Sequence, residues 1–308
     1  MKKGFLKKMT ASALAAMTVF SLAACGGEES AETKKEWVYV PTFTELQEEN
    51  VDYYEMKLVG DGLYYVSYEW DEETESSSES LIRYSLADDS VTKVPITWTD
   101  TERDHNLGTY CVGTDGSVYS IVYSYDMETY ESQEILCKFD ATGKQVFGID
   151  MTKYMEEDPE NSYINGMTLD GKGRIYISSN SVIWLFDAEG NYQGIVSVGS
   201  SANSWIQALG CGKDGKVYVS CYSYDGDSSS TNLTEIDFDG KTTGATYANF
   251  PSGNSQTLIP GIEQEFMVQD GMSVYEYDFE TQAKTKLFDW LDSDINGNFV
   301  QNFGALED

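Results

Sequence analysis

Residues able to support acid–base or metal chemistry are sparse in this chain. His105 is the only histidine among 308 residues, and it lies beside Arg103 and Asp104 in a polar stretch that we expect to be a solvated loop. A Ser-His-Asp relay or a histidine metal site would have to be built around this one ring. With 52 Asp and Glu residues, carboxylate pairs arise by chance, so a pair without known geometry indicates no glycosidase. We therefore expect no enzyme and no cofactor.

The cysteines other than Cys25 form no Cys-x-x-Cys pattern, which argues against a metal site. They lie in or beside predicted strands, which favours buried thiols that pack as small apolar groups. The four residues are Cys111, Cys137, Cys211 and Cys221. A bridge between the last two is conceivable in an exported protein, but the hairpin register places Cys211 opposite about residue 218.

One acidic stretch resembles part of a calcium-binding loop. Asp292, Asp294 and Asn296, followed by Gly297, match positions 1, 3, 5 and 6 of an EF-hand loop. Position 12, which requires a bidentate Glu, is Phe303. The alternative is an acidic connection that leads into a strand, so we expect no metal site.

Aromatic residues recur where longer loops are predicted. Flat aromatic rings among Asp, Glu, Asn and Ser suit stacking on sugar rings or docking of a protein. The alternative is that the rings cover the edges of sheets. The candidate ligand-binding residues are Trp70, Trp98, Tyr125, Tyr154, Trp205 and Tyr224, with Tyr130 in the same kind of loop. If these loops gather at one end of the fold, we expect a carbohydrate or another small solute to bind there.

The elements that position these residues form a repeat. Its clearest copy runs from Trp205 to Ser220, where two apolar runs flank Lys-Asp-Gly-Lys. This pattern predicts a hairpin whose Gly adopts positive φ. Further Asp-Gly copies begin at Asp61, Asp115 and Asp170. A strand followed by Asp-x-x-Gly or a relative comes next, with anchors at Ser85, Asp140, Asp187, Asp237 and Asp278 that are 55, 47, 50 and 41 residues apart.

This spacing is typical of four-stranded propeller blades. We predict an all-β propeller with about five blades and the start of a sixth. Blades two to five should begin near Leu107, Tyr163, Trp205 and Gln256. Asp270-Gly271 should join the second and third strands of the fifth blade. Because 298–308 reads as the opening strand of another blade, we expect an incomplete ring and a longer natural protein.

The N-terminus has the pattern of a targeting signal. Residues 1–25 combine four Lys, a short apolar core and Leu-Ala-Ala-Cys, which resembles a bacterial lipoprotein signal with the lipid on Cys25. The alternative is an ordinary secretory signal that ends near a Cys. Residues 26–36 are small and polar and predict a flexible tether, and residues 37–308 form the predicted propeller. Trp37 to Pro41 reads as a strand that could close the ring.

The blade phrases resemble those of NHL-type and TolB-like propellers. Together with the lipoprotein signal and the acidic tether, they resemble the N-terminal propeller part of large extracellular solute-binding lipoproteins of Gram-positive anaerobes. The resemblance implies an extracytoplasmic, membrane-anchored protein that serves as a non-catalytic binding or scaffold module of a transport system. A transporter or an envelope protein is the expected protein partner.

The net charge narrows the partners further. A formal charge of −32 argues against nucleic acid, which requires a basic surface. Two other functions stay open. One is a protein-interaction or envelope-assembly module. The other is a propeller lyase or hydrolase, which would need acidic residues, Arg103 and His105 on one face.

Overall fold

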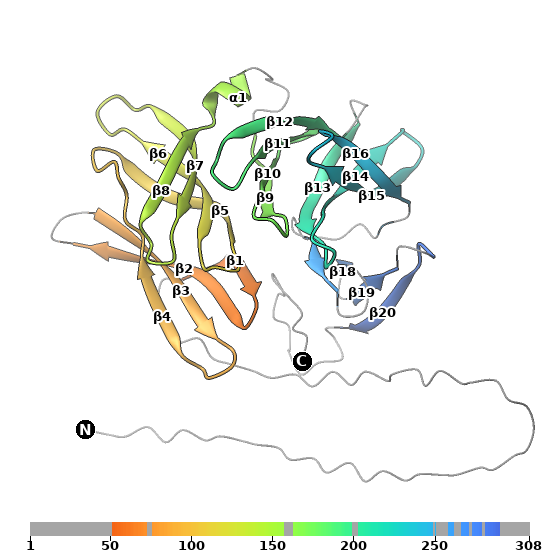
Figure 1. The fold of residues 1–308 in the computed structure, drawn as a ribbon, viewed down its shortest axis with the longest axis horizontal. Helices are drawn as coiled ribbons and strands as arrows, with labels where there is room; N and C mark the ends of the chain where they lie inside the picture. The colour runs from red at the N-terminus through yellow and green to blue at the C-terminus, as the bar shows by residue number, and fades with distance from the viewer. Residues whose placement is uncertain are drawn as a thin grey trace, which may run out of the picture. The chain divides into compact units, whose positions relative to one another are not determined.

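Five four-stranded sheets and one short helix follow one another along the described part of the chain (Figure 1). The computed structural model describes residues 51–72, 76–156, 163–198, 203–248, 250, 258–261, 266–270, 273–278 and 281–289. The predicted signal, tether, closing strand and sixth blade, together with Asp292, Asp294 and Asn296, lie outside these ranges.

Each sheet, here called a blade, contains four consecutive strands. Blade 1 has β1 (Val51–Val59), β2 (Gly62–Asp71), β3 (Ser76–Ser85) and β4 (Val91–Pro95). Blade 2 has β5 (Asp104–Val112), β6 (Val118–Tyr125), β7 (Ser132–Phe139) and β8 (Gln145–Asp150). Blade 3 has β9 (Gly166–Leu169), β10 (Ile175–Ser178), β11 (Val182–Phe186) and β12 (Tyr192–Ser197). Blade 4 has β13 (Ser204–Cys211), β14 (Val217–Tyr224), β15 (Ser229–Asp237) and β16 (Thr242–Tyr247). Blade 5 has β17 (Ile259–Pro260), β18 (Phe266–Asp270), β19 (Ser273–Tyr277) and β20 (Lys284–Asp289).

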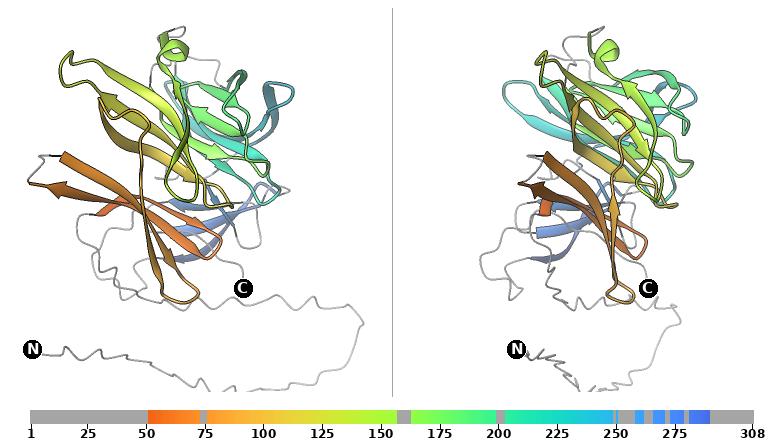
Figure 2. Two further views of the ribbon diagram at one scale, coloured as in Figure 1. Left: turned by 60° about the vertical axis from the view of Figure 1, so that its left-hand side comes forward. Right: turned by 90° about the vertical axis from the view of Figure 1, so that its left-hand side faces the viewer.

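The blades are antiparallel meanders joined through their first strands. Within each blade, strands pair in chain order, and β1, β5, β9, β13 and β17 contact one another in succession. Figure 1 shows the first four of these on the inner sides of their sheets, and Figure 2 shows the twist of each blade. This arrangement confirms the predicted all-β propeller with five blades. The first strands begin within three residues of the predicted starts, and Asp270 pairs with Ser273 across the predicted hairpin.

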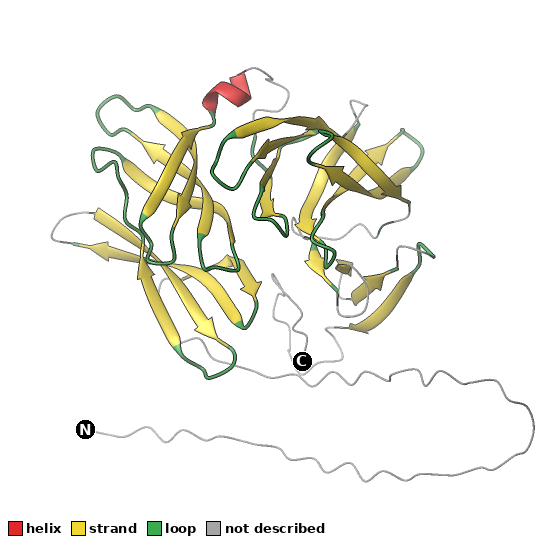
Figure 3. Ribbon diagram, viewed as in Figure 1, coloured by secondary structure: helices red, strands yellow, loops and turns green. Residues whose placement is uncertain are grey.

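One element is absent from the sequence prediction. A helix, α1 (Thr152–Glu156), follows β8 and is the single red segment of Figure 3. The helix is too short to show a periodic apolar face, so no sequence pattern predicts it. Its first turn starts from Met151, which is fully buried and whose carbonyl accepts the N–H of Tyr154 at 3.0 Å. No described helix has the length and apolar character needed to cross a membrane.

The turns after the first strands show where the predicted Asp-Gly pattern holds. Gly116 and Gly215 adopt φ of 80° and 77°, as expected. In blade 3 the positive φ of 77° belongs to Gly173 and not to Gly171. The reason is that Asp170 opens the turn instead of preceding its glycine, since Gly173 N–H donates to the Asp170 carbonyl at 2.9 Å. In blade 1 the positive φ belongs to Gly60 and not to Gly62.

The core lies between blades. Ile121 and Leu136 of blade 2 pack with Trp184 and Phe186 of blade 3, and all four side chains are fully buried. Corresponding clusters join blades 1 and 2, blades 3 and 4, and blades 4 and 5. Side chains alternate between the two faces of a strand, so blades 2, 3 and 4 each bury one face against the preceding blade and the other face against the following blade. This explains why their strands read as almost continuous apolar runs.

Candidate functional site

Exposed aromatic rings gather at one end of the blades. The connections after the second and fourth strands form this end, here called the loop end; the turns after the first and third strands form the turn end. Of the seven strongly exposed aromatic side chains in the described ranges, Tyr192 lies on an outer strand and six lie at the loop end. Those six are Trp70, Tyr123, Tyr130, Tyr163, Trp205 and Tyr224. They come from four blades, since Tyr163 precedes the first strand of blade 3.

The six predicted binding residues divide into two groups. Trp70, with 63% of its surface exposed, Trp205 and Tyr224 project from strand ends. The other three are partly buried by ring contacts within or between blades. The Trp98 ring lies 4.7 Å from that of His105 and 5.2 Å from that of Phe139.

Tyr125 and Tyr154 have ring partners of their own. Tyr125 packs edge-on to Tyr130, with centroids 6.3 Å apart. Tyr154 lies on α1 rather than in an irregular loop, and its ring is 4.6 Å from that of Tyr192. No ring contact joins two of the six predicted residues in the described part of the chain. Tyr123 and Tyr163 were not among the predicted residues, although Tyr123 precedes Tyr125 by two positions in the same strand.

Blade 4 carries an aromatic platform. Trp205 of β13 and Tyr222 of β14 are cross-strand partners, and their rings lie 4.6 Å apart with an interplanar angle of 38°. Tyr224 ends the same strand, and its hydroxyl donates to the Gly226 carbonyl at 2.7 Å. That bond holds the Tyr224 ring beside the loop after β14. The three rings thus form an apolar surface that is open to solvent.

A carboxylate follows the last tyrosine of the second strand in both blades 2 and 4. Asp225 accepts the backbone N–H groups of Ser228 at 2.8 Å and Asp227 at 3.1 Å, and these bonds hold its pKa below the usual range. Asp126 accepts the N–H groups of Thr129 and Glu128 with the same effect on its pKa. Both loop-end turns therefore hold a carboxylate beside aromatic rings, and the Asp126 carboxylate is also paired with Arg103, with Oδ2 and Nη1 3.9 Å apart.

Arg103 and His105 serve the structure at this end. Arg103 donates to Ser124 Oγ and to the Glu131 carbonyl, both at 2.9 Å, and so fastens the loop after β6. The prediction of a solvated loop for His105 is wrong, because the residue is half-buried in β5. Its Nε2 lies 3.1 Å from the Asp100 carbonyl oxygen, and its buried Nδ1 has no hydrogen-bond partner among the described residues. The Trp98 ring packs against this ring, which the sequence places in a polar stretch.

A buried carboxyl group joins blades 1 and 2. Glu79 of β3 is 4% exposed, and its Oε2 accepts the Leu107 N–H of β5 at 2.9 Å. Its Oε1 has no hydrogen-bond partner in the part of the chain that the structure describes. Burial raises the pKa of Glu79 to about 7. No feature of the sequence distinguishes this residue from the many exposed carboxylates, because its burial is created by the next blade.

No disulfide joins any two of the four described cysteines. Cys137 and Cys221 are buried, as predicted, and burial raises the pKa of each thiol to about 12. Cys111 and Cys211 are half-buried. Cys211 pairs with Val217 across the hairpin, one residue from the predicted position, so it does not face Cys221. Among the described residues, no group of three or more His, Cys, Asp or Glu side chains is placed to hold a metal ion.

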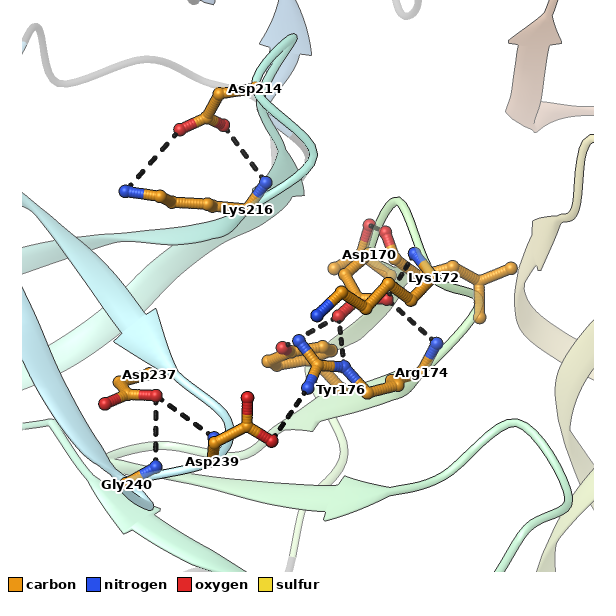
Figure 4. Close-up of polar contacts among 11 residues, drawn as sticks. Asp170, Lys172, Arg174, Tyr176, Asp214, Lys216, Asp237, Asp239 and Gly240 are labelled. Atoms are coloured by element: carbon orange, nitrogen blue, oxygen red, sulfur yellow. Dashed lines mark hydrogen bonds and ion pairs between the residues drawn. The ribbon is translucent and has the colours of Figure 1, made fainter.

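A polar lock joins blades 3 and 4 at the turn end (Figure 4). The Asp170 carboxylate, with a side chain 1% exposed, accepts the N–H groups of Lys172 and Arg174 and the Arg174 Nε–H at 2.5 Å. The same guanidinium reaches Asp239 of blade 4, with Nη1 and Oδ1 3.2 Å apart. The Tyr176 hydroxyl also donates to Asp170, and burial first, then the nearby Asp170 charge, raises its pKa.

Comparison with known proteins shows the fold alone. No family model and no curated protein matches the chain. It resembles solved β-propellers. The β-propeller domain of the Trilobed protease from Pyrococcus furiosus shares 10% identity over 81% of this chain and 73% of that chain, with a TM-score of 0.47. YCF48 bound to D1 peptide shares 10% over 80% and 69%, with a TM-score of 0.41. A puromycin hydrolase shares 11% over 78% and 47%, with a TM-score of 0.45. The similar structures include hydrolases as well as a protein bound to a peptide, so this likeness does not decide between catalysis and binding.

Proposed function

We propose that this chain is a non-catalytic binding module whose loop end holds a carbohydrate or a similar neutral solute. In this proposal it is a lipoprotein, anchored through Cys25 on the extracytoplasmic face of the membrane, and part of a solute-binding protein of a transport system. The observation that carries the proposal is the gathering of exposed aromatic rings from four blades beside fixed carboxylates.

The chemistry of this surface suits sugars. An aromatic ring covers the apolar C–H face of a sugar, and carboxylate oxygens accept hydrogen bonds from its hydroxyl groups. Tyr224 directly precedes Asp225, and Tyr130 lies beside Asp126, to whose carbonyl its N–H donates at 2.9 Å. Because the protein carries a formal charge of −32, neutral ligands should be favoured over anionic ones at low salt.

The test is a panel of neutral and anionic oligosaccharides titrated against the protein, with tryptophan fluorescence and calorimetry as readouts. We expect a neutral sugar to bind, and a Trp205→Ala/Tyr130→Ala double variant to lose at least tenfold in affinity. Leu86→Ala is the control, since it removes an exposed apolar side chain at the turn end. Unchanged sugar binding in the double variant, or no binding by any member of the panel, would contradict the proposal.

Two observations bear on the alternatives. Met127, 63% exposed in the same loop as Tyr130, favours a docked protein, because flexible apolar side chains adapt to varied partners. Binding of an envelope protein with no response to sugars would support that function. A propeller lyase or hydrolase would instead need Arg103 and His105 free for substrate, whereas both make structural contacts.

A further inference from the structure

A pocket opens between blades 1 and 2 at the turn end, away from the aromatic rings. It has a volume of about 420 Å³, within the range of pockets that hold small ligands. Tyr64, Leu81 and Val94 of blade 1 and Val118 of blade 2 form its apolar walls. The walls thus come from two blades, and the entrance lies among their turns.

The pocket exists because two filling side chains are missing. At the junction of blades 2 and 3, Phe147 of β8 lies so close to Gly190 that a Cβ there would approach the ring to 3.0 Å. Phe147 pairs with Lys138, which pairs with Tyr119. The matching row in blade 1 runs from Tyr64 through Arg83 to Thr92. Thr92 therefore stands where blade 2 has Phe147, and it lines the pocket.

The junction of blades 3 and 4 is filled in another way. Phe238, which follows Asp237 in the turn after β15, lies under the Arg174 guanidinium at 4.1 Å and 5.5 Å from the Tyr176 ring. In blade 2 the turn after β7 has Ala141 after Asp140, and Ala141 also lines the pocket. At the junction of blades 1 and 2 both positions hold a small residue, Thr92 and Ala141, and this leaves the junction open.

The rim of the pocket is acidic. Asp61, Asp115 and Asp140 line it together with a single cation, Arg83. Arg83 is already paired with Asp61 at 2.7 Å. Neither Asp115 nor Asp140 forms an ion pair with a described residue. Hydrogen bonds from Ser117 to the first carboxylate and from Thr142 to the second keep both pKa values low, so both carry charge at neutral pH.

We infer that this pocket is a second ligand site, independent of the loop end, which takes a small organic cation with an apolar body. The apolar body would occupy the space left by Thr92 and Ala141. The cationic group would lie between Asp115 and Asp140, which have no ion-pair partner among the described residues and feel Lys138 and Lys144 only at longer range. Binding should weaken as salt rises, because the carboxylates are open to solvent.

The test uses three probes with one apolar body, namely tryptamine, tryptophol and indole-3-acetate, titrated by calorimetry into the full chain at low salt. We expect tryptamine to bind, tryptophol to bind at least tenfold more weakly, and indole-3-acetate to show no binding. Asp115→Asn should weaken tryptamine binding several-fold. Glu128→Gln, an exposed change at the loop end, should leave it unaltered.

Two variants are designed to fill the pocket with the side chains that fill other junctions of this chain. Ala141→Phe copies Phe238 of blade 4, and Thr92→Phe copies Phe147 of blade 2, so at least one of them should fold with unchanged circular dichroism. A folded filling variant should lose tryptamine binding and keep sugar binding at the loop end. Equal binding of the three probes, or tryptamine binding that survives in a folded filling variant, would overturn the inference without affecting the proposed function.

Discussion

Glu79 of blade 1 accepts the backbone N–H of Leu107 of blade 2 at 2.9 Å, so a buried carboxyl group fastens two neighbouring blades. The bond closes where β5 bulges, since the pairing of β5 with β6 shifts between Leu107 and Tyr110. Bulges locally break the ladder of a strand. At this junction the Glu79 side chain satisfies a backbone donor of the inner strand.

The buried Glu79 should make stability depend on pH. Its pKa is about 7 in the folded protein, above the ordinary value of 4.5, so the folded state holds this proton more tightly than the unfolded state. Its contribution is therefore present at acidic pH and is lost as pH rises from about 4.5 to 7. The loss is about 3 kcal/mol. We expect the free energy of unfolding of Glu79→Gln, minus that of the wild type, to increase over this pH range and then to stay constant. Urea unfolding at several pH values measures this difference. Glu128→Gln should follow the wild type, and a constant difference between Glu79→Gln and wild type would contradict the prediction.

The two carboxylates on Arg174 should contribute unequally. Arg174→Met leaves the buried Asp170 without its charge partner, and we expect a loss of about 3 kcal/mol in the free energy of unfolding. Asp239 is 81% exposed, so Asp239→Asn should cost less than about 1 kcal/mol. Chemical denaturation of both variants measures the difference. Equal losses would show that the contact between blades, and not the buried pair, dominates.

Trp98 and Trp70 should behave oppositely, although both are predicted binding residues. Trp98 packs on Phe139 and His105, so Trp98→Ala should lower the free energy of unfolding by about 2 kcal/mol, less than for a fully buried ring. Trp70 is largely exposed, and Trp70→Ala should stay within about 0.5 kcal/mol of the wild type. Thermal unfolding compares the two. A destabilised Trp70→Ala variant would mean that its ring covers the blade.

The predicted anchor on Cys25 can be examined in cells. Expression in a bacterium grown with a labelled fatty acid should label the protein, since several acyl chains on one Cys give firm anchoring. Cys25→Ala should abolish the label and release the protein from the membrane fraction. Cys211→Ala, at a half-buried strand position, is the control and should keep the label. A label that persists in Cys25→Ala would refute the anchor.

Most of the fold can be predicted from sequence because its determinants are local. A hairpin needs only alternating apolar strands and a residue that tolerates positive φ, and both are present within about fifteen residues around Asp214 and Gly215. The anchors after the third strands recur at intervals of 41 to 55 residues, and this repetition identifies the blades. The same local reasoning misplaces the turn at Asp170, because one dipeptide fits two positions of a turn and only the hydrogen bonds distinguish them.

Exposure and burial at the sites depend on contacts between blades. Trp98 and Trp70 look alike in sequence, but only Trp98 meets the rings of the next blade. Glu79 becomes buried because blade 2 covers it, and the pocket opens because Thr92 and Ala141, about fifty residues apart, are both small. Packing and desolvation act between surfaces that meet only after folding. Sequence pattern therefore predicts the blades, whereas the tertiary structure decides which rings face solvent and which junction stays open.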